Sequence, residues 1–163
     1  MLKYIIVCFG FLLASCGFQP LYVVHENTLE QTAAVQIEPI SGQGGYQTEL
    51  ILQKRLNPEH IQVSPKYRLV VTINNPTYSN QSIRSDNFAT LKKMMISANY
   101  ELKDIQKNKV LISSSVDSNG LFNLVKDPYA TVTAKDKLYD NLVRTMADDI
   151  ATHILSYFKG VNP

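Results

Sequence analysis

The sequence predicts an α+β fold in which two helices pack on one face of a four-stranded, mostly antiparallel sheet, in the order β-α-β-β-β-α. Three observations predict it. Four segments alternate apolar and polar side chains, which is the period of a half-buried strand. Two other segments repeat their apolar side chains at helical spacing, and turn residues separate the segments. Elements in this order form a two-layer sandwich around one core.

Residues 1–15 have the parts of a bacterial lipoprotein signal. Lys3 supplies a positive charge, and an apolar run from 5 to 13 follows it. The run is shorter than the roughly 20 residues that a membrane-spanning helix needs, so it indicates a cleaved signal. Residues 13–16, Leu-Ala-Ser-Cys, resemble a lipobox, which predicts that the mature chain begins at a lipid-modified Cys16. An ordinary secretory signal that happens to precede a cysteine is the alternative.

The lipobox also bears on cysteine chemistry and on location. Cys8 would leave with the signal and Cys16 would be acylated, so we expect no disulfide and no thiol chemistry. Several acyl chains hold a protein firmly, since each buried methylene contributes about 0.8 kcal/mol. Many bacteria retain lipoproteins in the inner membrane by an aspartate at the next position. Gly17 stands there in this chain, which predicts the outer membrane.

The mature chain is expected to be a tether followed by one domain. Residues 16–32 show no periodicity, which predicts an extended lipidated tether, and residues 33–163 have the length of a single domain. The formal net charge of +2, with 18% charged residues and no long run of either sign, gives no reason to expect nucleic acid as a partner.

The first strand and the first helix follow the tether. Alternating side chains predict a strand over residues 33–40, with Pro39 at its end or on an edge. The glycine-rich residues 41–45 predict a turn; they lack the lysine of a P-loop and the spacing of a dinucleotide fingerprint. Apolar side chains then predict a helix over residues 46–56, which Asn57-Pro58 would stop.

Three further strands are predicted over residues 67–74, 94–103 and 110–117. Each has one apolar and one mostly polar face, and residues 106–109 are short enough for a hairpin between the last two. Residues 75–89 are rich in serine, asparagine and threonine. Either the second strand runs on past Pro76, or this stretch is an exposed loop and a place for function.

The final helix has the clearest pattern. Apolar side chains recur every fourth residue and predict packing on the sheet: Leu138, Leu142, Met146, Ile150, Ile154 and Phe158. Thr133, followed three residues later by Asp136, predicts the start of this helix, and Gly160 predicts its end.

No catalytic, cofactor-binding or metal-binding set is recognisable. His25, His60 and His153 are far apart and do not have the spacing of metal ligands. The adjacent Asp148 and Asp149 would point about 100° apart on a helix, which does not suit a paired carboxylate site. We therefore expect no enzyme, no cofactor and no metal.

The basic residues are more informative. Arg84, Lys92 and Lys93 flank the 75–89 stretch, and Lys126 and Lys135 flank the last connection. Together they could form one cluster that binds the phosphates of an anionic lipid, although ordinary solubilising charge explains them too. Aromatic side chains that could contact acyl chains or a protein wall occur near the same connections: Tyr78, Phe88, Phe122 and Tyr129.

Three features together resemble the LPS-assembly lipoprotein family, LptE. Residues 16–22 read Cys-Gly-Phe-Gln-Pro-Leu-Tyr directly after the lipobox. The expected order is β-α-β-β-β-α, and residues 121–131 lead from Leu-Phe-Asn through Pro-Tyr-Ala-Thr into the long final helix. The resemblance covers essentially the whole mature chain.

The resemblance implies a protein that is not an enzyme. It implies a plug inside the LptD-type outer-membrane β-barrel that assists the assembly of that barrel and the delivery of lipopolysaccharide to the outer leaflet. The implied partners are the barrel, lipopolysaccharide and the membrane. It also implies lipopolysaccharide contacts at Arg84 and Lys135, to which Lys92 and Lys93 are added on charge alone. The alternative is a free-standing outer-membrane lipoprotein, either a binding module or an accessory of envelope assembly.

Overall fold

The structure is a computed structural model that describes residues 26–83 and 89–161. In chain order its elements are α2 (Glu26–Ala33), β1 (Val35–Ile37), α3 (Gly45–Leu56), β2 (Tyr67–Ile73), β3 (Thr77–Ile83), β4 (Ala89–Asp104), β5 (Lys109–Asn123) and α4 (Pro128–Val161). The predicted α+β class is confirmed, with a five-stranded sheet in place of the expected four strands.

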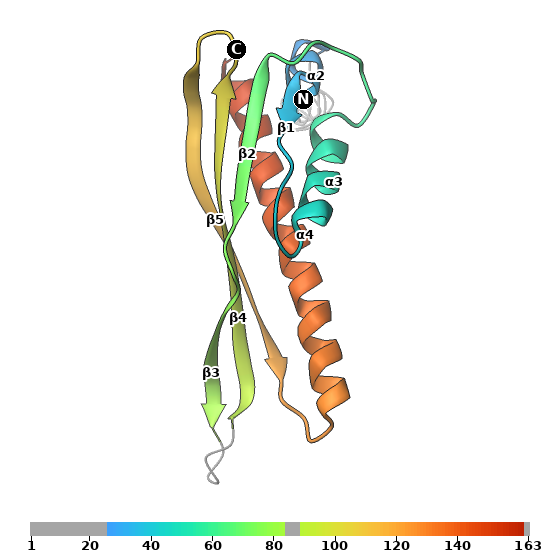
Figure 1. Ribbon diagram of the computed structural model, residues 1–163, viewed down its shortest axis with the longest axis vertical. Coiled ribbons are helices and arrows are strands. Elements are labelled where there is room, and N and C mark those ends of the chain that lie inside the picture. Colours follow the sequence, from blue (N-terminus) through green and yellow to red (C-terminus); the bar gives the residue numbers. More distant parts are fainter. Residues whose placement is uncertain (1–25, 84–88, 162–163) are drawn as a thin grey trace, which may run out of the picture.

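β4 is the central strand of this sheet. On one side it pairs antiparallel with β5 over residues 91–104. On its other side, residues 89–95 pair with β3 and residues 98–104 pair with β2, both antiparallel. β1 then adds parallel to β2. β2 and β3 are therefore two pieces that share one edge of β4, as Figure 1 shows.

A short break separates β2 from β3. The backbone N–H of Asn74 donates to the carbonyl oxygen of Ser97 at 2.8 Å, and its side-chain amide donates to Ser97 Oγ at 2.9 Å. Pro76 then follows, which has no N–H to donate. The second strand therefore does not run on past Pro76: it ends at Ile73, and a separate strand, β3, takes up Thr77–Ile83 of the 75–89 stretch.

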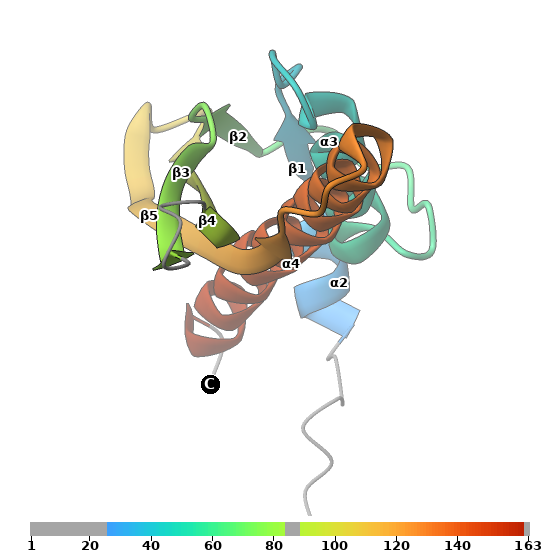
Figure 2. The same ribbon diagram turned by 90° about the horizontal axis from the view of Figure 1, so that it is seen from below.

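α4 runs along the length of the sheet and covers one of its faces, and α3 and α2 pack beside α4 at one end (Figures 1 and 2). We call this the helical end: α2, β1, α3, β2 and residues 98–104 of β4. The opposite end is the strand end: β3, residues 89–97 of β4, the last third of β5 and the first turns of α4. Of the described helices, none is long and apolar enough to cross a membrane.

The predicted alternation in β4 and the predicted stripe on α4 are both confirmed. From residue 94 to residue 102, every second side chain of β4 is buried: Met94, Ile96, Ala98, Tyr100 and Leu102. The α4 stripe that faces them is buried from its second member onward: Leu142, Met146, Ile150, Ile154 and Phe158. Burying an apolar side chain of this size contributes roughly 1.5–3 kcal/mol, so this contact dominates the core.

The glycine-rich stretch is a turn, as predicted. Gly42 and Gly44 have φ values of 96° and 79°, which glycine adopts readily. The turn lies against α4, because the Tyr139 hydroxyl donates to the Gln43 carbonyl oxygen at 2.6 Å. α3 follows and ends at Leu56, in agreement with the sequence.

The predicted boundaries of α4 are wrong at both ends. The helix begins at Pro128, because the Asp127 carboxylate accepts the backbone N–H of Tyr129 at 2.9 Å and proline is favoured at a first helical position. Thr133 and Asp136 lie inside the helix. Gly160 does not end it either, since a helical glycine costs only about 1 kcal/mol and the helix continues to Val161.

Two predictions near the N-terminal side of the domain also need correction. Residues 26–33 form α2 instead of extended chain, because Thr28 and Thr32 are one turn apart and both are buried, with α2 packed on α4. Residues 16–25 of the predicted tether lie outside the described residues. The first strand is shorter than predicted and spans only Val35–Ile37.

Candidate anion-binding site

The strand end contains a hollow of about 230 Å³ between β3, β4, β5 and the start of α4. Its lining combines two lysines, two aromatic rings, one leucine and one threonine: Lys92, Lys135, Tyr78, Phe122, Leu124 and Thr131. Four of these six residues were predicted from the sequence as charged or aromatic members of one cluster. The structure brings these four together.

Strand geometry separates the two adjacent lysines of β4. Side chains alternate between the faces of a strand, so Lys92 shares the inward face with Met94, and Lys93 lies on the outward face. Lys92 also pairs across the sheet with Phe122. The prediction that Lys93 joins the cluster is therefore not supported by its place in the strand. Extending the predicted β4 alternation two residues toward the N-terminus would have revealed this.

The two aromatic rings and Lys135 form a stack. Tyr78 packs edge-on against Phe122, with ring centroids 6.4 Å apart and an interplanar angle of 83°. The Lys135 Nζ atom lies 5.2 Å from the centroid of the Tyr78 ring, within the range of a cation–π interaction. Phe122 is 7% exposed and Tyr78 43% exposed, so the stack runs from the core to the surface.

A pair of hydrogen bonds fixes the loop between β5 and α4. The Thr131 hydroxyl accepts the backbone N–H of Val125 at 3.2 Å and donates to the carbonyl oxygen of the same residue at 3.3 Å. Thr131 therefore connects the loop to the first turn of α4. Lys135 lies one turn further along the same helix. No sequence pattern predicts this contact, although an aspartate followed by proline, as in Asp127-Pro128, is a recognisable start signal for a helix.

The charge of the hollow is not neutralised within the described part of the chain. No carboxylate there forms an ion pair with Lys92 or Lys135. At the helical end, by contrast, Arg55 pairs with Asp148 at 2.7 Å. The hollow thus places two ammonium groups beside aromatic and aliphatic side chains. This combination can bind a ligand that carries an anionic group next to an apolar part.

The other predicted site residues lie elsewhere. Cys16, Arg84 and Phe88 are outside the described residues. Tyr129 is 80% exposed at the start of α4, and neither it nor Lys126 lines the hollow.

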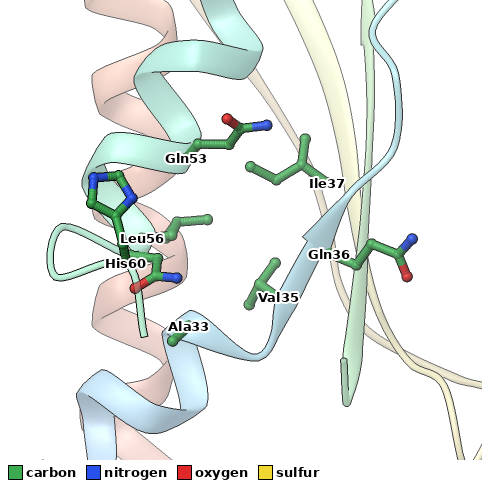
Figure 3. A pocket seen from close by; sticks show the side chains of 8 residues that line it. Ala33, Val35, Gln36, Ile37, Gln53, Leu56 and His60 are labelled. Carbon is green, nitrogen blue, oxygen red and sulfur yellow. The ribbon is translucent and has the colours of Figure 1, made fainter. Parts of the chain in front are cut away.

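A larger cavity of about 320 Å³ lies at the helical end, between β1, α3 and the turn after α3. Figure 3 shows Val35, Ile37 and Leu56 pointing into it, while Gln36 points away. Its lining residues are Ala33, Val35, Gln36, Ile37, Gln53, Leu56, Asn57 and His60, none of which carries the charge of a lysine, an arginine or a carboxylate. An anion would gain little there.

A third hollow, of about 300 Å³, lies between α3 and α4 and is basic. It is lined by Ile51, Lys54, Arg55, Arg144 and Asp148. The Arg55–Asp148 ion pair already occupies two of these side chains, and Ile51 is the single apolar one. The strand-end hollow therefore offers the better combination of free charge and apolar wall.

Within residues 26–83 and 89–161, no group of three or more His, Cys, Asp or Glu side chains is placed to hold a metal ion. The expectations that the chain binds no cofactor and is not an enzyme stay predictions.

No protein-family model matches the sequence, and no curated protein matches it. Several solved structures share its fold. A candidate lipoprotein from Caulobacter crescentus CB15 has a TM-score of 0.63 at 18% identity, over 82% of this chain and 97% of that one. The rare lipoprotein B from Shewanella oneidensis has a TM-score of 0.62 at 11% identity, over 78% and 100% of the two chains.

The lipoprotein B from Nitrosomonas europaea, which is uncharacterised, has a TM-score of 0.57 at 11% identity, over 77% of this chain and 82% of that one. Identities this low establish a common fold. They do not establish a common activity.

Proposed function

We propose that this chain is an outer-membrane lipoprotein that plugs an LptD-type β-barrel, assists its assembly, and helps to deliver lipopolysaccharide to the outer leaflet. The observation that carries the proposal is the strand-end hollow, where Lys92 and Lys135 lie beside Tyr78 and Phe122. The lipobox at Cys16 supports the anchor, and the fold shared with bacterial lipoproteins supports the general class.

The chemistry of the hollow fits such a ligand. Lipopolysaccharide is an amphiphile that carries phosphate groups next to acyl chains. A lysine ammonium binds phosphate as a compact point charge, and the neighbouring Phe122 and Leu124 offer apolar contact. Both kinds of group are present within one cavity, and no carboxylate of the described residues competes for the lysines.

The outward face of the sheet supports the plug. Its central rows carry the small polar side chains Ser97, Asn99, Ser113, Ser115 and Asn119, together with the carboxylates of Glu101 and Asp117. The interior of a large outer-membrane barrel is polar and hydrated, so a polar face that also carries charges can lie against it and stay hydrated. The long, narrow outline of the molecule in Figure 1 is suited to a channel.

Affinity purification from the native host tests this proposal. We would tag the C-terminus, extract membranes in mild detergent, and identify the co-purifying proteins and the mass of the N-terminal peptide. We expect one large β-barrel in near-stoichiometric amount and an acylated Cys16. A Cys16→Ala variant is the control and should lose the acyl mass. A lipidated chain that purifies alone would contradict the plug and favour the free-standing lipoprotein.

A further inference from the structure

The Tyr78 side chain lies between a buried ring and a charged group that belongs to another element. Its edge contact with Phe122 joins β3 to β5, and its cation–π contact with Lys135 joins β3 to α4. We propose that Tyr78 is a positioning residue: its ring holds the Lys135 ammonium at the mouth of the strand-end hollow. Lys135 is then already in place, together with Lys92, when an anion binds.

The geometry supports a directional role for the ring. Phe122 is nearly fully buried and therefore fixes the Tyr78 ring from the core side. The ammonium of Lys135 then lies 5.2 Å from the ring centroid, a distance at which the electron-rich face attracts a cation. Phe122, Tyr78 and Lys135 all line the hollow. The Tyr78 ring thus determines where the Lys135 ammonium lies relative to the hollow.

Holding the lysine in advance has a clear physical consequence. A lysine side chain on a helix surface has a flexible four-carbon stem and samples many rotamers. Ordering such a side chain when a ligand binds lowers the affinity. A ring that favours one position of the ammonium removes part of that loss. The identification of that anion as lipopolysaccharide rests on the proposed function.

Two substitutions separate the ring from the hydroxyl. Tyr78→Phe keeps the aromatic face, and Tyr78→Leu keeps an apolar side chain without it. Tyr129→Leu is the matched control, because Tyr129 is another exposed tyrosine of the strand end that does not line the hollow. All variants would be full-length chains purified from membranes in detergent.

The first readout is spectroscopic and needs no ligand. In protein labelled with ¹³C-lysine, the ε-methylene protons of Lys135 should show an upfield ring-current shift in the wild type and in Tyr78→Phe. Tyr78→Leu should abolish the shift, and Tyr129→Leu should leave it unchanged. An unshifted Lys135 in the wild type, or a shift that survives in Tyr78→Leu, would overturn the positioning role.

The second readout is the affinity for purified lipopolysaccharide. We expect Tyr78→Leu to bind about two- to fivefold more weakly, the effect of one cation–π contact, while Tyr78→Phe and Tyr129→Leu bind as the wild type does. Equal weakening by Phe and Leu would overturn the role of the ring. A wild type with the ring-current shift but no affinity for lipopolysaccharide would count against the proposed ligand and leave the positioning of Lys135 supported.

Discussion

The helical end and the strand end of the molecule use the same kinds of side chain in opposite ways. At the helical end several cations are paired, including Lys66 with Glu30 and Arg68 with Glu38, and α3 packs on α4. At the strand end Lys92 and Lys135 have no carboxylate partner in the described chain, and Tyr78 is exposed beside a hollow. The hollow that combines two such lysines with an aromatic and aliphatic wall therefore lies at the strand end.

The difference follows from the layers. At the helical end α4 covers the sheet and is itself covered by α3 and α2, so buried area accumulates there. At the strand end α4 is the one helix of the described residues beside the strands (Figure 1), and fewer apolar side chains are buried there. The two ends therefore divide the work along the long axis: most of the core lies at the helical end, and the candidate binding groups lie at the strand end. A binding surface must keep charged groups without protein partners, whereas a core pairs them.

The largest expected effect compares one leucine from each end. Leu52→Ala removes a fully buried side chain of α3 and should lower the free energy of unfolding by about 2–5 kcal/mol. Leu124→Ala removes a half-buried side chain of the hollow and should lower it by less than about 2 kcal/mol. Urea denaturation of both variants measures the difference. Equal losses would show that the two ends are equally packed.

The second effect concerns the two adjacent lysines of β4. Lys92→Gln should weaken binding of lipopolysaccharide about tenfold or more, because it removes a charge-assisted contact from the hollow. Lys93→Gln removes the same charge from the opposite face and should leave the affinity unchanged. Equilibrium binding at one ionic strength measures both. If Lys93→Gln weakens binding as much, diffuse surface charge accounts for the affinity, and the hollow is not the site.

A smaller effect tests the corrected start of α4. Asp127→Ala removes the carboxylate that accepts the Tyr129 N–H and should cost about 0.5–2 kcal/mol, with faster amide exchange confined to the first turn of the helix. Thr133→Ala, at the start that the sequence predicted, should leave exchange in that turn unchanged. Faster exchange in Thr133→Ala but not in Asp127→Ala would show that the helix starts at Thr133.

The smallest effect lies where the turn before α3 meets α4. Burial raises the pKa of Tyr139 above 10.0, with smaller contributions from Tyr78 and Asp140, and burial raises the pKa of Tyr100 as well. A raised pKa means that the folded protein holds these protons more tightly than the unfolded chain. Stability is therefore intact below pH 10 and falls as pH rises through the raised values.

Tyr139→Phe should make this decline shallower without removing it, because Tyr100 still titrates. Denaturation at several values from about pH 9 to about pH 11 gives the slope, and the stability at the lowest pH shows what the loss of the neutral hydrogen bond to Gln43 costs. An unchanged slope would contradict the assignment to Tyr139.

Much of the fold could be predicted because its signals are local. The alternation of β4 and the four-residue repeat of α4 each follow from the period of one element, and both agree with the observed burial. β3 was harder, because its sequence is Thr-Tyr-Ser-Asn-Gln-Ser-Ile and carries little apolar alternation. Backbone pairing with β4 makes this segment a strand. The side-chain pattern of β3 does not reveal that pairing, although β4 follows it closely in the sequence.

The candidate site shows the same division. Charge and aromatic content drew attention to Lys92, Lys135, Tyr78 and Phe122, and their gathering at one end of the sandwich was predicted. Which face each lysine takes depended on the true start of β4, which lies five residues before the predicted one. Thr131 was not foreseen, because its contact with Val125 arises only when the loop and the helix are both in place.

By itself, the sequence determined the α+β class, the face that each long element buries, the turn before α3 and the residue types available to a site. Tertiary structure decided that β3 is a strand, that Lys92 and Lys93 lie on opposite faces, and that Tyr78 holds Lys135 beside Phe122. The physical reason is range. Periodicity and capping act within one element, whereas a cavity exists only between elements that the whole fold has brought together.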